Sequence, residues 1–144
     1  MKSPSYSKHY ETLMAVVTHL AVNKWAIRQP KGIARDLSID VENVIYVLEN
    51  FKGLFRKSAG ASRDHGDSYY CLHLRFARQV TDEDNNKERP PLESAYLVPL
   101  LEFVSKRASE ESHRGTVMTT AMITATLSLF ASLVSVALTI LRTH

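Results

Sequence analysis

The feature that most constrains this chain is an uncharged stretch, TVMTTAMITATLSLFASLVSVALTIL, which covers residues 116–141. A helix of that length extends about 39 Å, whereas the hydrocarbon core of a bilayer is about 30 Å thick. The alternative is a buried central helix, but a chain of 144 residues has too little other apolar surface to surround one. We therefore expect one transmembrane helix over residues 115–142.

The basic residues around this stretch predict its orientation. Three of them, Lys106, Arg107 and Arg114, precede it, and only Arg142 follows. Because basic residues stay on the cytoplasmic side, we expect the N-terminal part to lie in the cytosol. The start of the chain lacks the apolar core of a signal peptide. The expectation is a single-pass, tail-anchored protein of the cytoplasmic (inner) membrane.

Small and hydroxyl-bearing residues gather on one side of the expected span when it is drawn as a helix. They are Thr120, Ala121, Thr124, Ser128, Ser132, Ser135 and Thr139. Small residues let helix backbones approach, and hydroxyls can bond across the contact. The stripe predicts self-association into a homo-oligomer. Two alternatives stay open: a ring of helices lining a water-filled path, and a chance arrangement in an anchor rich in Ser and Thr.

Charge divides the chain into parts with different surroundings. Residues 1–78 hold 12 Lys or Arg against 7 Asp or Glu, whereas residues 79–113 hold 4 against 8. The single cysteine, Cys71, excludes an intramolecular disulfide. A basic front, an acidic middle and an apolar end favour three separately organised segments.

The front segment has the apolar spacing of helices. Apolar residues recur at helical intervals from residue 6 to about residue 23, and Pro30 suits the first turn of a short second helix. After a tight turn at Ser38 and Ile39, Asp40 is a suitable N-cap for a third helix, VENVIYVLENFKG, which Gly53 is placed to end. That helix is expected to bury Val41, Val44, Ile45, Val47, Leu48 and Phe51.

After Gly53 the apolar period changes to that of strands. LFRK is expected to form a short strand, SAGASRDHGD a polar turn, and SYYCLHLRF a second strand. One face of the second strand would carry Tyr70, Leu72, Leu74 and Phe76, and the other Tyr69, Cys71, His73 and Arg75. The predicted fold class is mainly α with a small β-hairpin.

The run IARDLSIDVENVIYVLENFKGLFRKS resembles the helix, turn, recognition helix and start of the wing in bacterial winged helix-turn-helix proteins. The resemblance covers roughly residues 8–78. It implies a winged-helix domain over residues 1–78, of a kind that serves DNA binding and protein contact alike.

Two binding roles follow for this domain. In a nucleic-acid complex, Asn43 would reach a base edge and basic side chains would contact phosphates. The candidate residues for nucleic-acid or partner binding are Lys31, Arg35, Asn43, Tyr46, Arg56, Lys57, Arg63 and Arg75. The third helix argues against DNA binding. Its exposed face carries Glu42 and Glu49, and the helix has no Lys or Arg before Lys52. That composition favours a protein partner.

No motif for catalysis or for a cofactor was found. His65, Cys71 and His73 lack the paired spacing of zinc sites, and neither a phosphate-binding loop nor a nucleophile elbow occurs. We therefore expect no enzymatic activity, no metal and no cofactor.

The middle of the chain is expected to form two pieces. QVTDEDNNKERPP, residues 79–91, has the composition of a flexible acidic linker. Residues 92–112 then predict an amphipathic juxtamembrane helix that is either kinked at Pro99 or begins near Val98. This helix could pack on the front domain, pair with a copy of itself, or lie at the membrane interface.

Three functions agree with this plan. The first is a non-enzymatic tail-anchored protein whose cytosolic winged helix binds a protein or nucleic-acid partner. The second is a membrane-perturbing effector, because the plan resembles small effectors of bacterial anti-phage defence or toxin-type systems, in which a sensing domain is joined to a membrane segment. The third is a membrane-tethered, DNA-binding transcription regulator.

Overall fold

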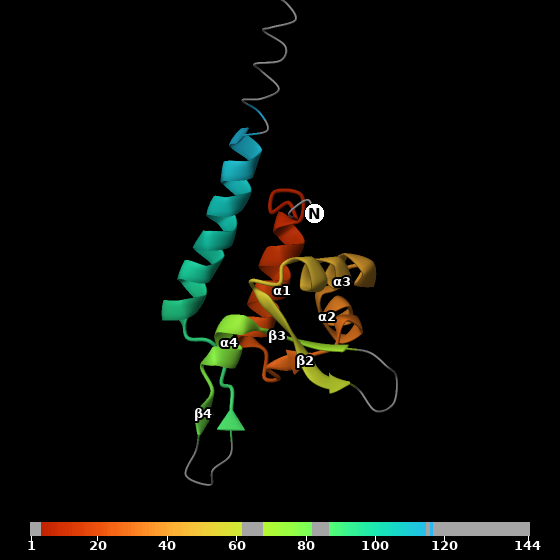
Figure 1. Ribbon diagram of the computed structural model, residues 1–144, viewed down its shortest axis with the longest axis vertical. Coiled ribbons are helices and arrows are strands. Elements are labelled where there is room, and N and C mark those ends of the chain that lie inside the picture. Colours follow the sequence, from red (N-terminus) through yellow and green to blue (C-terminus); the bar gives the residue numbers. More distant parts are fainter. Residues whose placement is uncertain (1–3, 62–67, 82–86, 115, 117–144) are drawn as a thin grey trace, which may run out of the picture. The chain divides into compact units, whose positions relative to one another are not determined.

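The computed structural model describes residues 4–61, 68–81, 87–114 and 116. In chain order the elements are α1 (Tyr10–Val22), β1 (Ile27–Arg28), α2 (Pro30–Leu37), α3 (Val41–Asn50), β2 (Phe55–Ala61), β3 (Ser68–Leu72), α4 (His73–Ala77), β4 (Val80–Thr81) and β5 (Lys87–Glu88), and a further helix covers residues 94–114 (Figure 1). The described residues are mainly helical with a small three-stranded antiparallel sheet, which confirms this part of the predicted fold class.

The chain divides into two compact units, Met1–Ala108 and Ser109–His144. The elements from α1 to β5 belong to the first unit. Apart from residue 116, the predicted membrane span lies outside the described residues, and so do all of its predicted interface residues. Among the residues that are described, no helix combines the length and the apolar character needed to cross a membrane.

Helix α1 is the centre of the core of the first unit. Its buried residues are Leu13, Val16, Val17, Leu20 and Ala21, at the helical spacing that the sequence predicts. The helix begins at Tyr10, later than the predicted start, because residues 6–9 form a turn. It ends at Val22, since Asn23 adopts an extended conformation.

The α2–α3 pair forms as the local sequence dictates. Pro30 occupies the first turn of α2, and Ser38 ends that helix in the left-handed conformation with φ of 56°. The Asp40 carboxylate then accepts a hydrogen bond of 3.0 Å from the Glu42 N–H, which caps α3.

Two details of α3 differ from the prediction. Ile45, expected in the core, is 36% exposed, because Val44, Val47 and Leu48 already fill the inward face. The helix ends at Asn50, where the Phe51 N–H bonds the Val47 carbonyl. Gly53 therefore lies beyond the end of the helix and does not terminate it.

Strands β2 and β3 form the predicted hairpin, and β1 adds to the free side of β3 in the order β1-β3-β2. The predicted strand over residues 68–76 is too long. β2 begins at Phe55, opposite Leu72, so residues after Leu72 have no partner on that strand. The His73 N–H bonds the Leu54 carbonyl at 2.9 Å, and the chain turns into α4.

The described residues of the predicted linker, 79–81 and 87–91, include two short strands. β4 and β5 pair antiparallel, with Val80 opposite Glu88 and Thr81 opposite Lys87. At the end of this segment, the Leu92 N–H bonds the Ala21 carbonyl at 2.9 Å, and the Leu92 side chain is buried. The segment is therefore attached to the end of α1.

The part of this helix that belongs to the first unit, residues 94–108, packs against the core of that unit. Val104 and Ala108 are buried, and Leu97, Leu100 and Leu101 are partly buried against the same core. Contact with the core of the first unit is one of the three possibilities considered for this helix, and the structure shows it for residues 94–108. The helix begins ahead of Pro99, so the predicted start near Val98 is wrong.

Candidate functional site

The solvent face of α3 is the first candidate site. It presents two apolar side chains, Ile45 and Tyr46, of which Tyr46 is 40% exposed. Around them lie the exposed residues Glu42, Asn43, Glu49 and Asn50. Helix α3 contains no Lys or Arg. This face combines an apolar centre with an acidic and amide-bearing rim.

Neighbouring side chains hold Tyr46 and Glu49 in place. The His9 ring stacks on Tyr46 with centroids 4.4 Å apart and an interplanar angle of 29°. The Tyr70 hydroxyl donates a hydrogen bond of 3.2 Å to Glu49 Oε1. Burial raises the pKa of Tyr70, and the Glu49 carboxylate raises it further. The phenol is therefore a stable donor that orients the Glu49 side chain.

The predicted basic residues do not form one surface. Lys31 and Arg35 are exposed on α2 and line one cavity, whereas Arg56 and Lys57 on β2 line another, next to the C-terminal end of α3. The Arg56 guanidinium lies 4.1 Å from the Phe76 ring centroid, and Arg89 stacks on the same ring at 4.1 Å. Arg63 lies outside the described residues.

The prediction that Arg75 contacts phosphates or a partner is wrong. Its side chain is fully buried, with 0% exposure, because the chain enters α4 at His73 instead of continuing as a strand. The guanidinium donates hydrogen bonds to the carbonyls of Leu20, Asn23, Lys24, Arg89 and Pro90. Arg75 therefore joins the end of α1 to residues 89 and 90.

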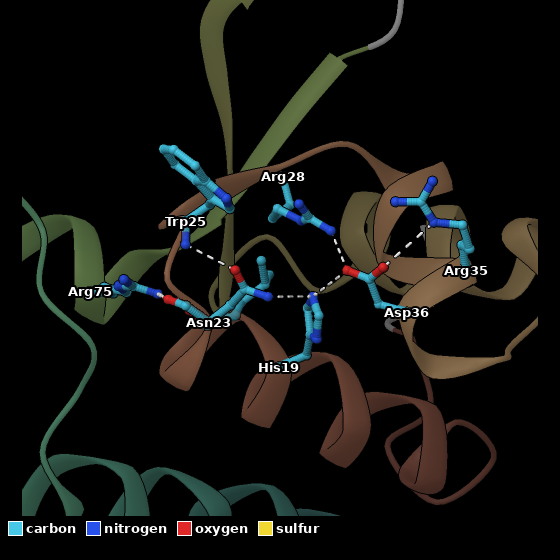
Figure 2. A network of polar contacts seen from close by, with 8 residues as sticks. His19, Asn23, Trp25, Arg28, Arg35, Asp36 and Arg75 are labelled. Atoms are coloured by element: carbon cyan, nitrogen blue, oxygen red, sulfur yellow. Dashed lines mark hydrogen bonds and ion pairs between the residues drawn. The ribbon is translucent and has the colours of Figure 1, made fainter.

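A polar network links α1, β1 and α2 (Figure 2). Asp36 on α2 accepts a close hydrogen bond from Arg28 on β1, and its carboxylate lies 3.6 Å from Arg35 Nε and 3.6 Å from His19 Nε2. His19 Nε2 also lies 3.3 Å from Asn23 Nδ2. Burial lowers the pKa of His19; Asp36 opposes this shift and Arg28 adds to it.

The network therefore contains a neutral His19 at neutral pH. The Nε2 atom of a neutral ring can accept a hydrogen bond from the Asn23 amide. The Asp36 carboxylate then forms its ion pairs with the two arginines, Arg28 and Arg35. This arrangement fixes Arg28 and Arg35 on either side of one carboxylate.

Sequence reasoning missed three residues that the structure places at these sites. Trp25 and Arg28 line the cavity with Lys31 and Arg35, and His9 stacks on Tyr46. An exposed tryptophan beside a two-residue strand gives no periodic signal, so only the fold brings it next to α2.

Comparison with known proteins gave no match to a family model, to a curated protein or to a solved structure. The arguments below therefore depend on the geometry and chemistry of the chain itself.

Proposed function

We propose that the first unit is a winged-helix-type binding domain whose α3 surface recognises a protein partner. Support for the fold comes from the order of the elements, α1, β1, α2, a tight turn, α3 and the β2–β3 hairpin, with the sheet order β1-β3-β2. This is the succession of helices, turn and hairpin for which the sequence resembles winged helix-turn-helix proteins.

The observation that carries the protein-binding proposal is the charge of α3. A helix in a DNA groove lies close to phosphates on both sides, so its exposed residues are favoured when they are basic or neutral. Here Asp40, Glu42 and Glu49 are exposed at or on α3, and the helix itself holds no cation. Their carboxylates would repel a polyanion and would attract basic groups on a protein.

The same face has the parts of a protein interface. Tyr46 and Ile45 supply an apolar centre, and aromatic anchors of this kind contribute most of the binding free energy in many complexes. Glu42 and Glu49 supply charge at the rim, which selects a partner by its complementary charge. The partner surface we propose has an apolar pocket bordered by Lys or Arg.

We further propose that residues 115–142 hold this domain at the cytosolic face of a membrane and associate with copies of themselves. The support is the uncharged run over residues 116–141, the basic residues ahead of it and its stripe of small and hydroxyl-bearing side chains. In this proposal the protein acts by binding, and its span raises the local concentration of the α3 surface.

A photo-crosslinking experiment tests the α3 proposal. A photoreactive amino acid replaces Tyr46 in the full chain, and a matched one replaces Glu11, which is exposed on α1. We expect ultraviolet light to give one discrete protein adduct at position 46 and none at position 11. Adding Glu42→Lys and Glu49→Lys should remove that adduct by reversing the rim charge.

Duplex DNA provides the opposing measurement. We expect the full chain in detergent to bind a duplex no more tightly than about 10⁻⁵ M at physiological salt, within the range of non-specific binding. Binding a thousandfold tighter with a strong dependence on salt, or a nucleic-acid adduct at position 46, would overturn the proposal.

A further inference from the structure

Strand β2 lies at one edge of the three-stranded sheet (Figure 1). Its seven residues belong to a strand that pairs with β3 on one side, and no other described strand pairs with its second side. The opposite edge of the sheet, β1, is two residues long and offers little backbone to a partner. A free edge strand presents unpaired backbone donors and acceptors, so another chain can add to it as a further strand.

The ladder between β2 and β3 determines which backbone groups of β2 point outward. The His73 N–H bonds the Leu54 carbonyl at 2.9 Å, and hydrogen-bonded pairs alternate with non-hydrogen-bonded pairs along an antiparallel ladder. Arg56 therefore directs its backbone groups toward Cys71, whereas the N–H and carbonyl of Lys57 point away from β3. No other described residue hydrogen-bonds to these two groups of Lys57. They are free to pair with an added strand.

A groove with a volume of about 770 Å³ adjoins this edge. The Phe55 N–H bonds the Phe51 carbonyl at 3.1 Å, so the outward side of β2 at its start faces the chain that leaves α3. Residues of these two segments line the groove, among them the buried apolar side chains of Leu48 and Phe55. The groove therefore provides room beside β2 for the side chains of an added strand.

Positive charge surrounds the groove. Lys52, Arg56 and Lys57 line it, and all three are exposed. Within the described part of the chain, none of the three forms an ion pair, and the Arg56 guanidinium lies against the Phe76 ring. One carboxylate, that of Glu49, lines the groove against these three cations. An acidic segment would therefore be attracted to this edge.

The same cations argue against a second copy of β2 as the occupant of the edge. Two β2 strands that paired with each other would bring the Arg56 and Lys57 side chains of both copies together, and like charges on adjacent strands repel. An acidic strand would instead place its carboxylates beside these cations. The charge of the edge thus selects the kind of strand that can add to it.

We propose that the outer edge of β2 binds an extended, acidic segment of another protein as an added strand. The Lys57 N–H and carbonyl form hydrogen bonds with the backbone of that segment, and its carboxylates lie next to Lys52, Arg56 and Lys57. Backbone pairing supplies affinity, and the cations provide the preference for an acidic sequence. This inference goes beyond the α3 proposal and does not depend on it, because β2 is not part of the α3 face.

A synthetic peptide tests the proposal. A fluorescein-labelled heptapeptide of alternating glutamate and valine is titrated with the full chain in nanodiscs of uncharged phosphatidylcholine, and fluorescence anisotropy measures binding. We expect a dissociation constant below about 100 μM. A peptide with lysine in place of glutamate should not bind. A peptide with proline in place of valine keeps the charge but loses backbone donors, so it should bind at least about tenfold more weakly.

Two substitutions at position 57 separate the side-chain charge from the backbone donor. Lys57→Ala removes the ammonium and keeps the N–H, whereas Lys57→Pro removes both. Proline suits this position because β3 does not use the Lys57 N–H. We expect Lys57→Pro to bind the acidic peptide at least about fivefold more weakly than Lys57→Ala, which corresponds to the loss of one hydrogen bond. Thermal unfolding verifies that both variants are folded.

Charge reversal gives a second measurement that leaves the backbone unchanged. Lys52→Glu with Lys57→Glu should weaken binding of the acidic peptide at least about tenfold. The matched control reverses two exposed cations elsewhere, Lys8→Glu with Lys24→Glu, and should leave the affinity within about twofold. Both measurements leave Tyr46 unchanged, so their outcome is read separately from crosslinking at that position.

Three results would contradict strand addition at β2. The first is no saturable binding of the glutamate–valine peptide. The second is equal affinity of folded Lys57→Pro and Lys57→Ala for this peptide. The third is binding of duplex DNA tighter than about 10⁻⁷ M that Lys52→Glu with Lys57→Glu abolishes, which would assign these cations to nucleic acid instead.

Discussion

Among the described residues, the hydrogen-bond partners of Arg75 are backbone carbonyls, and these carbonyls come from two distant segments of the chain. The carbonyls of Leu20, Asn23 and Lys24 lie at the end of α1, where helix geometry leaves carbonyls without partners. Burial lowers the pKa of Arg75, because removing a cation from water disfavours its charged form. The hydrogen bonds that its planar set of donors forms with these carbonyls offset the desolvation of the guanidinium.

Replacing this side chain should destabilise the first unit. We expect Arg75→Met to lower the free energy of unfolding by about 3 kcal/mol, since it leaves several buried carbonyls unsatisfied. Arg75→Lys should lose less, because an ammonium retains three donors. Denaturant unfolding measures both. Arg35→Met is the control: the Arg35 side chain is 81% exposed, so a change of about 0.5 kcal/mol at most is expected there.

His19 should make stability depend on pH. Burial lowers the pKa of folded His19 below the ordinary histidine value of 6.5, so the unfolded chain binds the proton first as pH falls. Stability should therefore decrease as pH falls through 6.5 and level off below the folded pKa. His19→Gln should remove this component of the pH dependence of the unfolding midpoint. Identical profiles for the two proteins would contradict the role assigned to His19.

At the scale of elements, boundaries were predictable where a local chemical signal sets them. Pro30 and Asp40 mark the starts of α2 and α3, and both act as the sequence indicates. The end of β3 was not predictable, because alternation continues to Phe76 and only the start of β2 at Phe55 removes the partner. The burial of Arg75 and the cavity beside Trp25 were not predictable for the same reason, because both depend on contacts between distant segments of the chain.

The cap of α3 gives a measurable element-scale prediction. Asp40→Ala should lower the free energy of unfolding by about 1 kcal/mol, since it frees the Glu42 N–H at the first turn. Asp40→Asn keeps an oxygen acceptor and should cost less than half as much. Thermal unfolding distinguishes the two. Equal losses would show that the negative charge, and not the hydrogen bond, stabilises the helix.

At the scale of the whole molecule, the proposed self-association depends on residues 115–142. Thr124→Leu with Ser128→Leu should convert oligomers to monomers in detergent, because larger side chains keep helix backbones apart. Leu129→Ala with Leu133→Ala, on the opposite side of the predicted helix, is the matched control and should keep the oligomer. Analytical ultracentrifugation measures both. Oligomers that survive the Thr124 and Ser128 changes would reject this interface.

The hydrogen bond from Leu92 to Ala21 extends the cooperative unit well past the β2–β3 hairpin. Leu92 and Val104 share one core with α1. We therefore expect amide protons in the last turn of α1 and those near Leu92 and Val104 to exchange with solvent in the same opening event. A chain cut after residue 78 would lack this part of the core and two of the carbonyls that Arg75 binds. A shortened chain that is intended to fold alone should accordingly extend to residue 108.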